Sequence, residues 1–121
     1  MSLGALDAVG QVLSTALDGV SMSQNAIANN IANVDTPHYR ATTVDFQNAL
    51  KAAIDDGSYA KGSATVKPQV SAENTPVGAN GNNVDLSKET LAGMQSQYQY
   101  QVLSRAISDR FDRIHQSLSA S

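Results

Sequence analysis

The chain has 121 residues, a net charge of −3, no Cys and no Trp. This length allows one domain at most, and without Cys neither a disulfide nor a Cys-ligated metal site can form. The eight Lys and Arg residues are scattered along an acidic chain, which argues against nucleic acid as the main partner.

The apolar residues favour helix formation more strongly than tertiary burial. Leu, Ile, Val and Phe together make up about a fifth of the chain, and Ala alone contributes 17 residues. Ala forms helices readily but buries little surface. We therefore expect a marginal monomer that completes its core with partners.

The N-terminal sequence also bears on export. No basic leader precedes an apolar run, so we expect no cleaved secretory signal. No stretch approaches the roughly 18 consecutive apolar residues that a membrane-spanning helix needs.

Residues 1–34 predict one long helix. Apolar residues recur every three or four positions, which places them on one side of a helix. This stripe consists of Leu6, Val9, Leu13, Ala16, Val20, Ile27 and Ile31. It has the length of a coiled-coil seam of about three to four heptads. It fits either a core-facing helix of a small bundle or an assembly surface, and only one other helix is long enough to cover it.

Residues 35–57 predict a turn and a short helix. Pro37 disfavours helical geometry at Thr36, so the first helix should end by Asn33 or Val34. Residues 40–44 alternate weakly and predict an extended segment. The short helix that follows should place Phe46, Leu50, Ala53 and Ile54 on one face.

Residues 58–84 are rich in Gly, Ser, Ala, Asn and Pro. Extended segments are compatible with the sequence between Ala64 and Val70, but Pro68 restricts them to edge strands. Loop-like segments of this length are usually functional or disordered. We expect this one to become ordered only against a neighbouring subunit.

Residues 85–121 predict the second long helix, beginning near Asp85 or Ser87, with Glu89 in the first turn where negative charge is favourable. Two apolar stripes lie on nearly opposite faces. The first is Leu91, Met94, Tyr98 and Val102, and the second is Tyr100, Leu103, Ile107, Phe111, Ile114 and Leu118. A hairpin with the first helix covers only one stripe, so the other is left for another subunit or for the middle segment.

Few residues indicate chemistry. His38 and His115 lack the spacing of a zinc site. The Gly-rich stretch 78–83 lacks the Gly-Lys-Ser/Thr ending of a nucleotide-binding loop, and no Ser lies in a G-x-S-x-G elbow. We therefore expect no enzyme activity, no metal or other cofactor, and no small-molecule substrate.

One segment has a recognisable pattern. Residues 23–33 read SQNAIANNIAN, followed by Thr36-Pro37 and Tyr39-Arg40-Ala41. This pattern resembles the N-terminal signature of bacterial flagellar rod and hook proteins. Within that family, the short length and three further segments are similar to proximal rod proteins. These segments are Val44-Asp45-Phe46, Asn82-Asn83-Val84-Asp85-Leu86 and Gln99-Tyr100-Gln101. The family commonly has Gly after Thr-Pro, where this chain has His38, which tolerates a positive φ less freely than Gly.

The resemblance implies a non-enzymatic structural subunit of the proximal rod in the periplasm. The rod would be a helical hollow tube that starts at the membrane ring of the basal body and transmits torque. The implied partners are copies of this chain, other rod proteins, the rod-to-ring adaptor and the ring, and the flagellar type III apparatus would export the chain uncleaved. The motif Asn30, Asn33, Thr36, Pro37 and Tyr39 would act structurally, with the Asn side chains holding the helix end and Tyr39 packing on the helices.

We therefore expect a mainly α fold in which long N- and C-terminal helices pack as a coiled-coil-like pair. The expected assembly residues are Leu6, Val9, Leu13, Val20, Ile27, Ile31, Leu91, Met94, Tyr98, Leu103, Ile107, Phe111, Ile114 and Leu118. Two alternatives stay open. One is a different rod subunit; the other is a soluble helical binding module or secretion chaperone, which would remain a folded monomer or a closed dimer.

Overall fold

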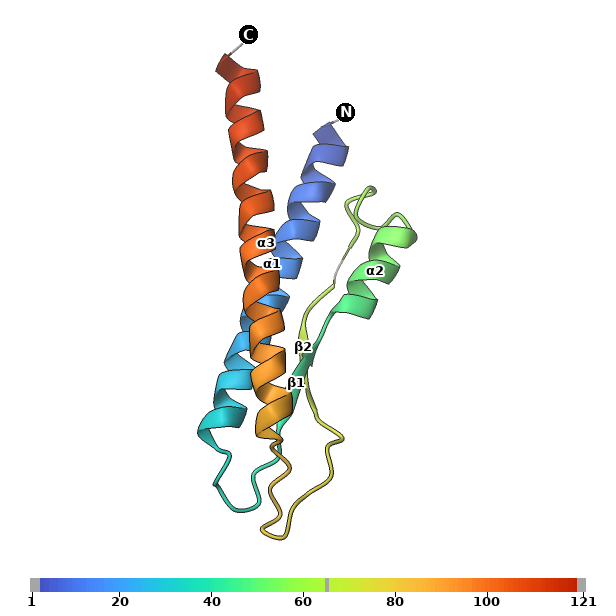
Figure 1. The fold of residues 1–121 in the computed structure, drawn as a ribbon. Helices are drawn as coiled ribbons and strands as arrows, with labels where there is room; N and C mark the ends of the chain where they lie inside the picture. Colours follow the sequence, from blue (N-terminus) through green and yellow to red (C-terminus); the bar gives the residue numbers. More distant parts are fainter. Residues whose placement is uncertain (1–2, 65, 120–121) are drawn as a thin grey trace.

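In the computed structural model, the chain is an elongated helical hairpin with a short helix and two short strands along one side (Figure 1). The structure describes residues 3–64 and 66–119, with side chains described from Ala8 onward. The elements are α1 (Leu3–Ala32), β1 (Thr42–Asp45), α2 (Gln47–Asp55), β2 (Gln69–Ala72) and α3 (Leu86–Ser119). The predicted mainly α class, with two long helices packed together, is confirmed.

The two long helices run in opposite directions, so both termini lie at one end of the molecule and the connecting loops lie at the other (Figure 1). At the loop end, α1 stops as the sequence predicts. The Asn33 backbone N–H donates to Asn29 O at 3.1 Å, and the Thr36 N–H donates to Asn33 O at 3.0 Å. Pro37 follows directly and cannot continue a helix.

The middle segment becomes ordered against its own chain, so the expectation that it needs a neighbouring subunit is wrong. Strands β1 and β2 pair antiparallel, with Val44 opposite Val70. Tyr59 is buried in the core, and Val66 packs against it. The backbone of β1 supplies the hydrogen bonds and α1 supplies the apolar surface that this segment needs. Pro68 directly precedes β2, as expected for an edge strand.

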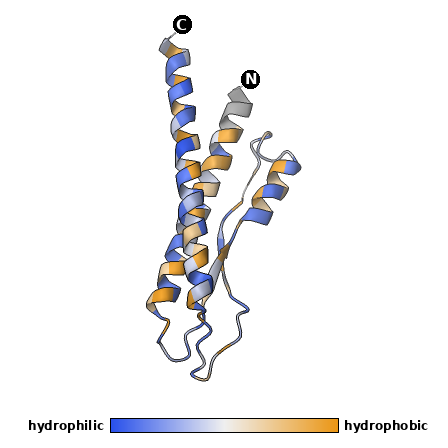
Figure 2. Cartoon of the chain, viewed as in Figure 1, coloured by the Kyte–Doolittle hydropathy of each residue, from blue (hydrophilic) through white to orange (hydrophobic). Residues whose placement is uncertain are grey.

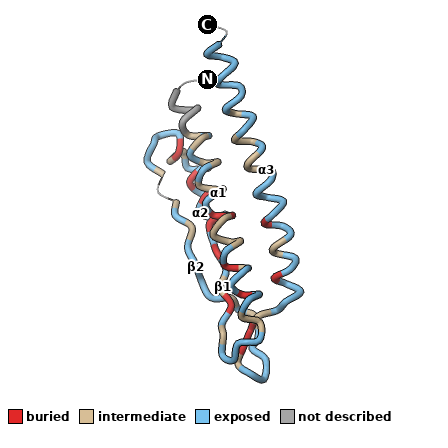
Figure 3. Tube along the Cα trace, turned by 90° about the vertical axis from the view of Figure 1, so that its left-hand side faces the viewer, coloured by how far each residue is buried: buried red, intermediate tan, exposed pale blue. Residues whose placement is uncertain are grey.

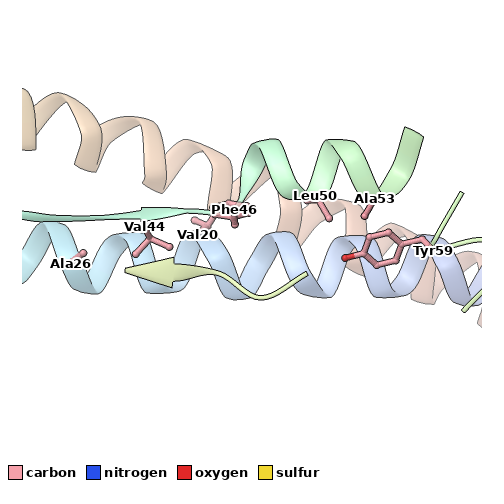
Figure 4. Close-up of a cluster of buried hydrophobic side chains, with 7 residues drawn as sticks. All are labelled: Val20, Ala26, Val44, Phe46, Leu50, Ala53 and Tyr59. Atoms are coloured by element: carbon pink, nitrogen blue, oxygen red, sulfur yellow. The ribbon is translucent and has the colours of Figure 1, made fainter. Parts of the chain in front are cut away.

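The hydrophobic core lies between α1 and residues 44–59, which include the end of β1 and all of α2, rather than between the two long helices. Its buried side chains are Val20, Ala26, Val44, Phe46, Leu50, Ala53 and Tyr59 (Figure 4). Full burial of a large apolar side chain contributes about 1.5–3 kcal/mol. Ile54 departs from the prediction for the short helix, because it is 47% exposed. Phe46 is the N-cap of α2, so the helix begins at Gln47 and does not include Phe46 as predicted.

The face of α1 that meets β1, α2 and Tyr59 consists mostly of small residues. It includes Ala8, Val12, Thr15, Gly19, Ala26 and Asn30, all buried or half-buried. Gly19 shows why size matters here. A Cβ at this position would lie 2.6 Å from Phe46 Cδ1, so the aromatic ring rests on the helix backbone. The Tyr59 hydroxyl donates to Thr15 Oγ1 at 3.1 Å on the same face.

Replacing Gly19 with Ala should therefore destabilise the chain by about 1–3 kcal/mol, because the new methyl group displaces a buried ring. Elsewhere in a helix the same change is stabilising by roughly 0.5–1 kcal/mol. Gly93→Ala is the matched control, since a Cβ there would lie at an ordinary 3.7 Å from Ile27 Cγ2. Urea unfolding followed by circular dichroism measures both variants. Equal effects of the two substitutions would contradict the packing described.

Candidate functional site

Most of the apolar surface that α3 carries is not covered by the chain itself. Its first stripe points outward, with Met94 65% and Tyr98 68% exposed. Near the C-terminal end, Phe111 and Leu118 are 67% and 71% exposed. Exposed positions dominate α3, whereas buried positions gather where α1 meets β1 and α2 (Figure 3). The colours of Figure 2 show apolar residues recurring along the ribbon of α3 between hydrophilic ones.

Small and polar residues make up the face of the first half of α3 that meets α1. Gly93 lies against Ile27, and the Ser96 hydroxyl donates to Val20 O at 3.4 Å. Glu89 and Ser96 are both buried. The large apolar residues on this side come later, where Leu103 borders the core and Ile107 is half-buried. Because the sequence pattern follows large apolar residues, it did not predict Glu89 or Gly93 as contact positions.

The predicted stripe on α1 is covered unevenly. Val20 is buried, while Leu13 and Ile27 are half-buried. Val9 and Ile31 are exposed. Leu6 lies outside the residues whose side chains are described. The hairpin therefore leaves apolar surface open on both long helices.

An apolar groove of about 310 Å³ lies beside the core. Phe46 and Leu50 border it on the side of α2, and Tyr98, Val102 and Leu103 border it on α3. The exposed stripe of α3 thus continues into a depression that reaches buried side chains. The arrangement is a surface for packing against another apolar element.

At the loop end, a cluster of three buried Asn side chains joins the elements; we call Asn30, Asn82 and Asn83 the asparagine junction. Asn30 Nδ2 donates to Thr42 O at 2.8 Å, and its Oδ1 accepts from Thr42 N at 3.0 Å. The Tyr39 hydroxyl also donates to Asn30 Oδ1, at 3.3 Å. One carboxamide therefore pairs with β1 as the backbone of a neighbouring strand would.

The other two members connect the loop before α3 to the rest of the chain. Asn82 Nδ2 donates to Asn33 O and Thr36 O, both at 2.8 Å. Asn83 Oδ1 accepts from Ala41 N at 2.6 Å. Asn83 Nδ2 donates to the carbonyl oxygens of residues 73 and 75 at 3.3 and 3.2 Å. In the sequence, Asn82 and Asn83 belong to a segment that resembles proximal rod proteins, but the sequence indicated no hydrogen-bonding role for them.

The remaining residues of the predicted turn motif lie next to this junction. Asn33 Nδ2 donates to Asn29 O at 2.8 Å, and the Thr36 hydroxyl donates to Asn33 Oδ1 at 3.0 Å. Pro37 is exposed, and Tyr39 is half-buried.

His38 occupies the position where the turn requires a positive φ, with a value of 63°. Its backbone N–H donates to Asn80 O at 3.0 Å, which ties the two loops together. A left-handed conformation costs a residue with a Cβ roughly 1–2 kcal/mol. His38 therefore takes a conformation that Gly would adopt without this cost. The His38 ring leaves no room for a side chain at Gly81, where a Cβ would lie 2.5 Å from Nδ1.

The start of α3 is fixed by Asp85 rather than Ser87. Asp85 Oδ1 accepts from the Lys88 N–H at 3.1 Å, as an N-cap residue does. Glu89, predicted as a favourable first-turn charge, is instead buried. Burial raises the pKa of Glu89 to about 7; Glu73 acts in the same direction, and a hydrogen bond with Asn30 acts against it.

The described residues hold no group of three or more His, Asp or Glu side chains that would suit a metal ion. None of the helices in the described part of the chain combines the length and apolar character that a bilayer crossing requires. The candidate functional site is therefore the open surface of the hairpin, held in shape by the asparagine junction.

Comparison with known proteins agrees with this interpretation. Residues 11–40 match the family model described as flagella basal body rod protein. This range contains most of α1, including Asn30, and the turn as far as Arg40.

Curated relatives extend the match over most of the chain. The flagellar basal body rod protein FlgB of Bacillus subtilis is 36% identical over 113 residues, covering 86% of this chain and 88% of the relative. FlgB of Borreliella burgdorferi is 30% identical over 117 residues, covering 82% and 87%. FlgB of Escherichia coli is 30% identical over 124 residues, covering 88% and 89%.

Long helices with open apolar faces, together with these matches, define a structural subunit of the flagellar basal-body rod. The chain belongs to the FlgB family of rod proteins. The family predicted from the signature at residues 23–41 is thus confirmed. As a rod protein the chain is located in the basal body and assembles with other basal-body components. The relatives are named as flagellar basal body rod proteins.

The asparagine junction can be tested with Asn82→Asp. The carboxylate keeps the shape of the side chain but loses the two donors to Asn33 O and Thr36 O and places a charge beside these carbonyl groups. We expect a loss of about 2 kcal/mol or more in the free energy of unfolding. Asn25→Asp, on an exposed position of α1, should change it by less than about 0.5 kcal/mol. A small effect at both positions in chemical denaturation would show that the junction is not important for stability.

Proposed function

We propose that this chain polymerises with copies of itself and with other rod proteins into a helical hollow tube, the proximal rod. The rod starts at the membrane ring and transmits torque. The observation that carries this proposal is the uncovered apolar surface of α3, in a chain whose family is a rod family. Exposed apolar patches that continue along an element indicate a protein interface.

The two long helices provide the contacts in this proposal. The outward stripe of α3, with Leu91, Met94 and Tyr98, packs against helices of neighbouring subunits. The exposed parts of α1, at Val9 and Ile31, do the same. A buried aromatic side chain removes about 150–250 Å² from water, and each Å² of apolar surface contributes about 25 cal/mol. Covering these residues supplies the stability that the single chain lacks.

We infer the remaining partners from the position of the proximal rod in the basal body. One end of the rod meets the rod-to-ring adaptor and the membrane ring, and the rod lies in the periplasm. The flagellar type III export apparatus delivers the chain without cleaving a signal. A soluble binding module or secretion chaperone would instead keep one closed oligomeric state, because its apolar surface is satisfied within a finite complex.

Phe111→Asp tests the proposal without disturbing the monomer. Phe111 is 67% exposed, so a charge there should change the free energy of unfolding by less than about 0.5 kcal/mol. In a polymer the same charge would be buried without a partner, which costs several kcal/mol. We expect the unmodified chain to associate as its concentration rises, and sedimentation velocity should show that Phe111→Asp does not. Ile107 is less suitable, because its own chain already covers it in part.

Gln116→Asp is the matched control. It adds the same charge to the same exposed end of α3, but on the side opposite the apolar stripe that contains Phe111. Both variants can also replace the native gene in a flagellated bacterium, with immunoblotting to verify protein levels. Swimming should be lost with Phe111→Asp and retained with Gln116→Asp. Normal association and swimming with Phe111→Asp would contradict the proposed interface.

A further inference from the structure

The only two Glu residues of the chain, Glu73 and Glu89, lie together at the start of α3. Glu89 is on the helix and is 1% exposed. Glu73 follows β2, and its side chain is 7% exposed. None of the described residues forms a hydrogen bond with the buried Oε1 of Glu89. Two carboxyl groups facing each other out of water cannot both carry a charge without a large cost.

Other groups around the pair do not balance a second charge. From α3, Lys88 Nζ lies 3.1 Å from Glu73 Oε2, and its side chain is 53% exposed. The Thr75 hydroxyl donates to the same Glu73 oxygen at 3.1 Å. From α1, the neutral amide of Asn30 faces Glu89, and the Tyr39 hydroxyl bonds to Asn30. Among the described residues, the ammonium group beside the pair is that of Lys88; it is engaged by Glu73 and offsets a charge on Glu89 only weakly.

We propose that Glu89 is a proton-controlled latch that holds the start of α3 against α1 and the segment 73–75. With a proton bound, the Glu89 O–H donates to the Glu73 carboxylate and the pair carries a single negative charge, which Lys88 balances. When the proton passes to solvent, two carboxylates face each other in a buried space. Their repulsion separates the start of α3 from residues 73–75.

The direction of the pH effect follows from the same geometry. Burial raises the pKa of Glu89 from 4.5 to about 7 in the folded chain. A raised pKa means that the folded state binds the proton more tightly than the unfolded state. The latch therefore contributes its full stability below about pH 4.5 and loses it as the pH rises through about 7. The latch is separate from the open apolar faces, so it does not depend on the proposed assembly.

The direct test is the titration of the full-length chain labelled with ¹³C at Glu Cδ. Two carboxyl resonances are expected, one for each Glu, and Glu89→Gln identifies the resonance of Glu89 by removing it. The Glu89 resonance should titrate with a midpoint near pH 7. If both resonances titrate near 4.3, the ordinary value for Glu, the latch does not exist.

The variant Glu73→Gln tests whether Glu73 helps to raise the pKa of Glu89 or whether burial alone raises it. With a neutral partner, the Glu89 midpoint should fall below that of the unmodified chain. An unchanged midpoint would contradict the role of Glu73.

Stability measurements supply a second readout. Between pH 5 and 8.5, the unfolding equilibrium constant of the unmodified chain should rise roughly 100-fold more than that of Glu89→Gln, which mimics the protonated form. Asp109→Asn removes an exposed carboxylate and should keep the pH dependence of the unmodified chain. The same pH dependence in Glu89→Gln and the unmodified chain would overturn the proposal. If Glu89→Gln does not fold, Glu73→Gln assigns the two resonances instead, and the titration of the unmodified chain decides.

Discussion

The hydrogen bonds of the asparagine junction determine how the rest of the molecule is arranged. Asn30, Asn82 and Asn83 are buried, and their carboxamides bind backbone groups of the α1 end, β1 and the loops on both sides. Each satisfied bond contributes about 0.5–1.5 kcal/mol, but a buried backbone group left without its partner costs about 1–3 kcal/mol. The family match at residues 11–40 includes Asn30 and the turn that Asn82 holds. The junction therefore joins the end of α1, the strand β1 and the loop before α3.

Moving away from this end, the chain covers progressively less of its own surface. Next to the junction, α1 is packed by β1 and α2, and Phe46 lies on the Gly19 backbone. Beyond Arg110 every described residue of α3 is exposed. The chain therefore packs one end by itself, whereas at the other end apolar residues of both long helices stay exposed. The same construction explains why a chain with so few large apolar residues has a small core of its own.

Both long helices and the turn could be predicted from the sequence because large apolar residues recur at helical intervals and Pro37 ends the first helix. The contacts made by small residues could not be predicted, since Gly19, Ala26 and Gly93 do not stand out in a pattern of apolar residues. Pairing of Val44 with Val70 joins segments that are distant in sequence, and local patterns contain no information about it. Glu89 looked like a favourable surface charge at a helix start, because its burial depends on Asn30 and Glu73, which arrive from other segments. The residues expected at subunit contacts stay predictions.

The central claim is that α3 is completed by neighbouring subunits rather than by its own chain. Amide hydrogen exchange on a dilute monomer, followed by the same measurement after assembly, tests it most directly. In the monomer, amides in the C-terminal half of α3 should exchange much faster than those of α1 between Thr15 and Asn30, since few packed contacts oppose local opening there. On assembly they should become strongly protected. Equal protection of both regions in the monomer, unchanged by assembly, would contradict the claim.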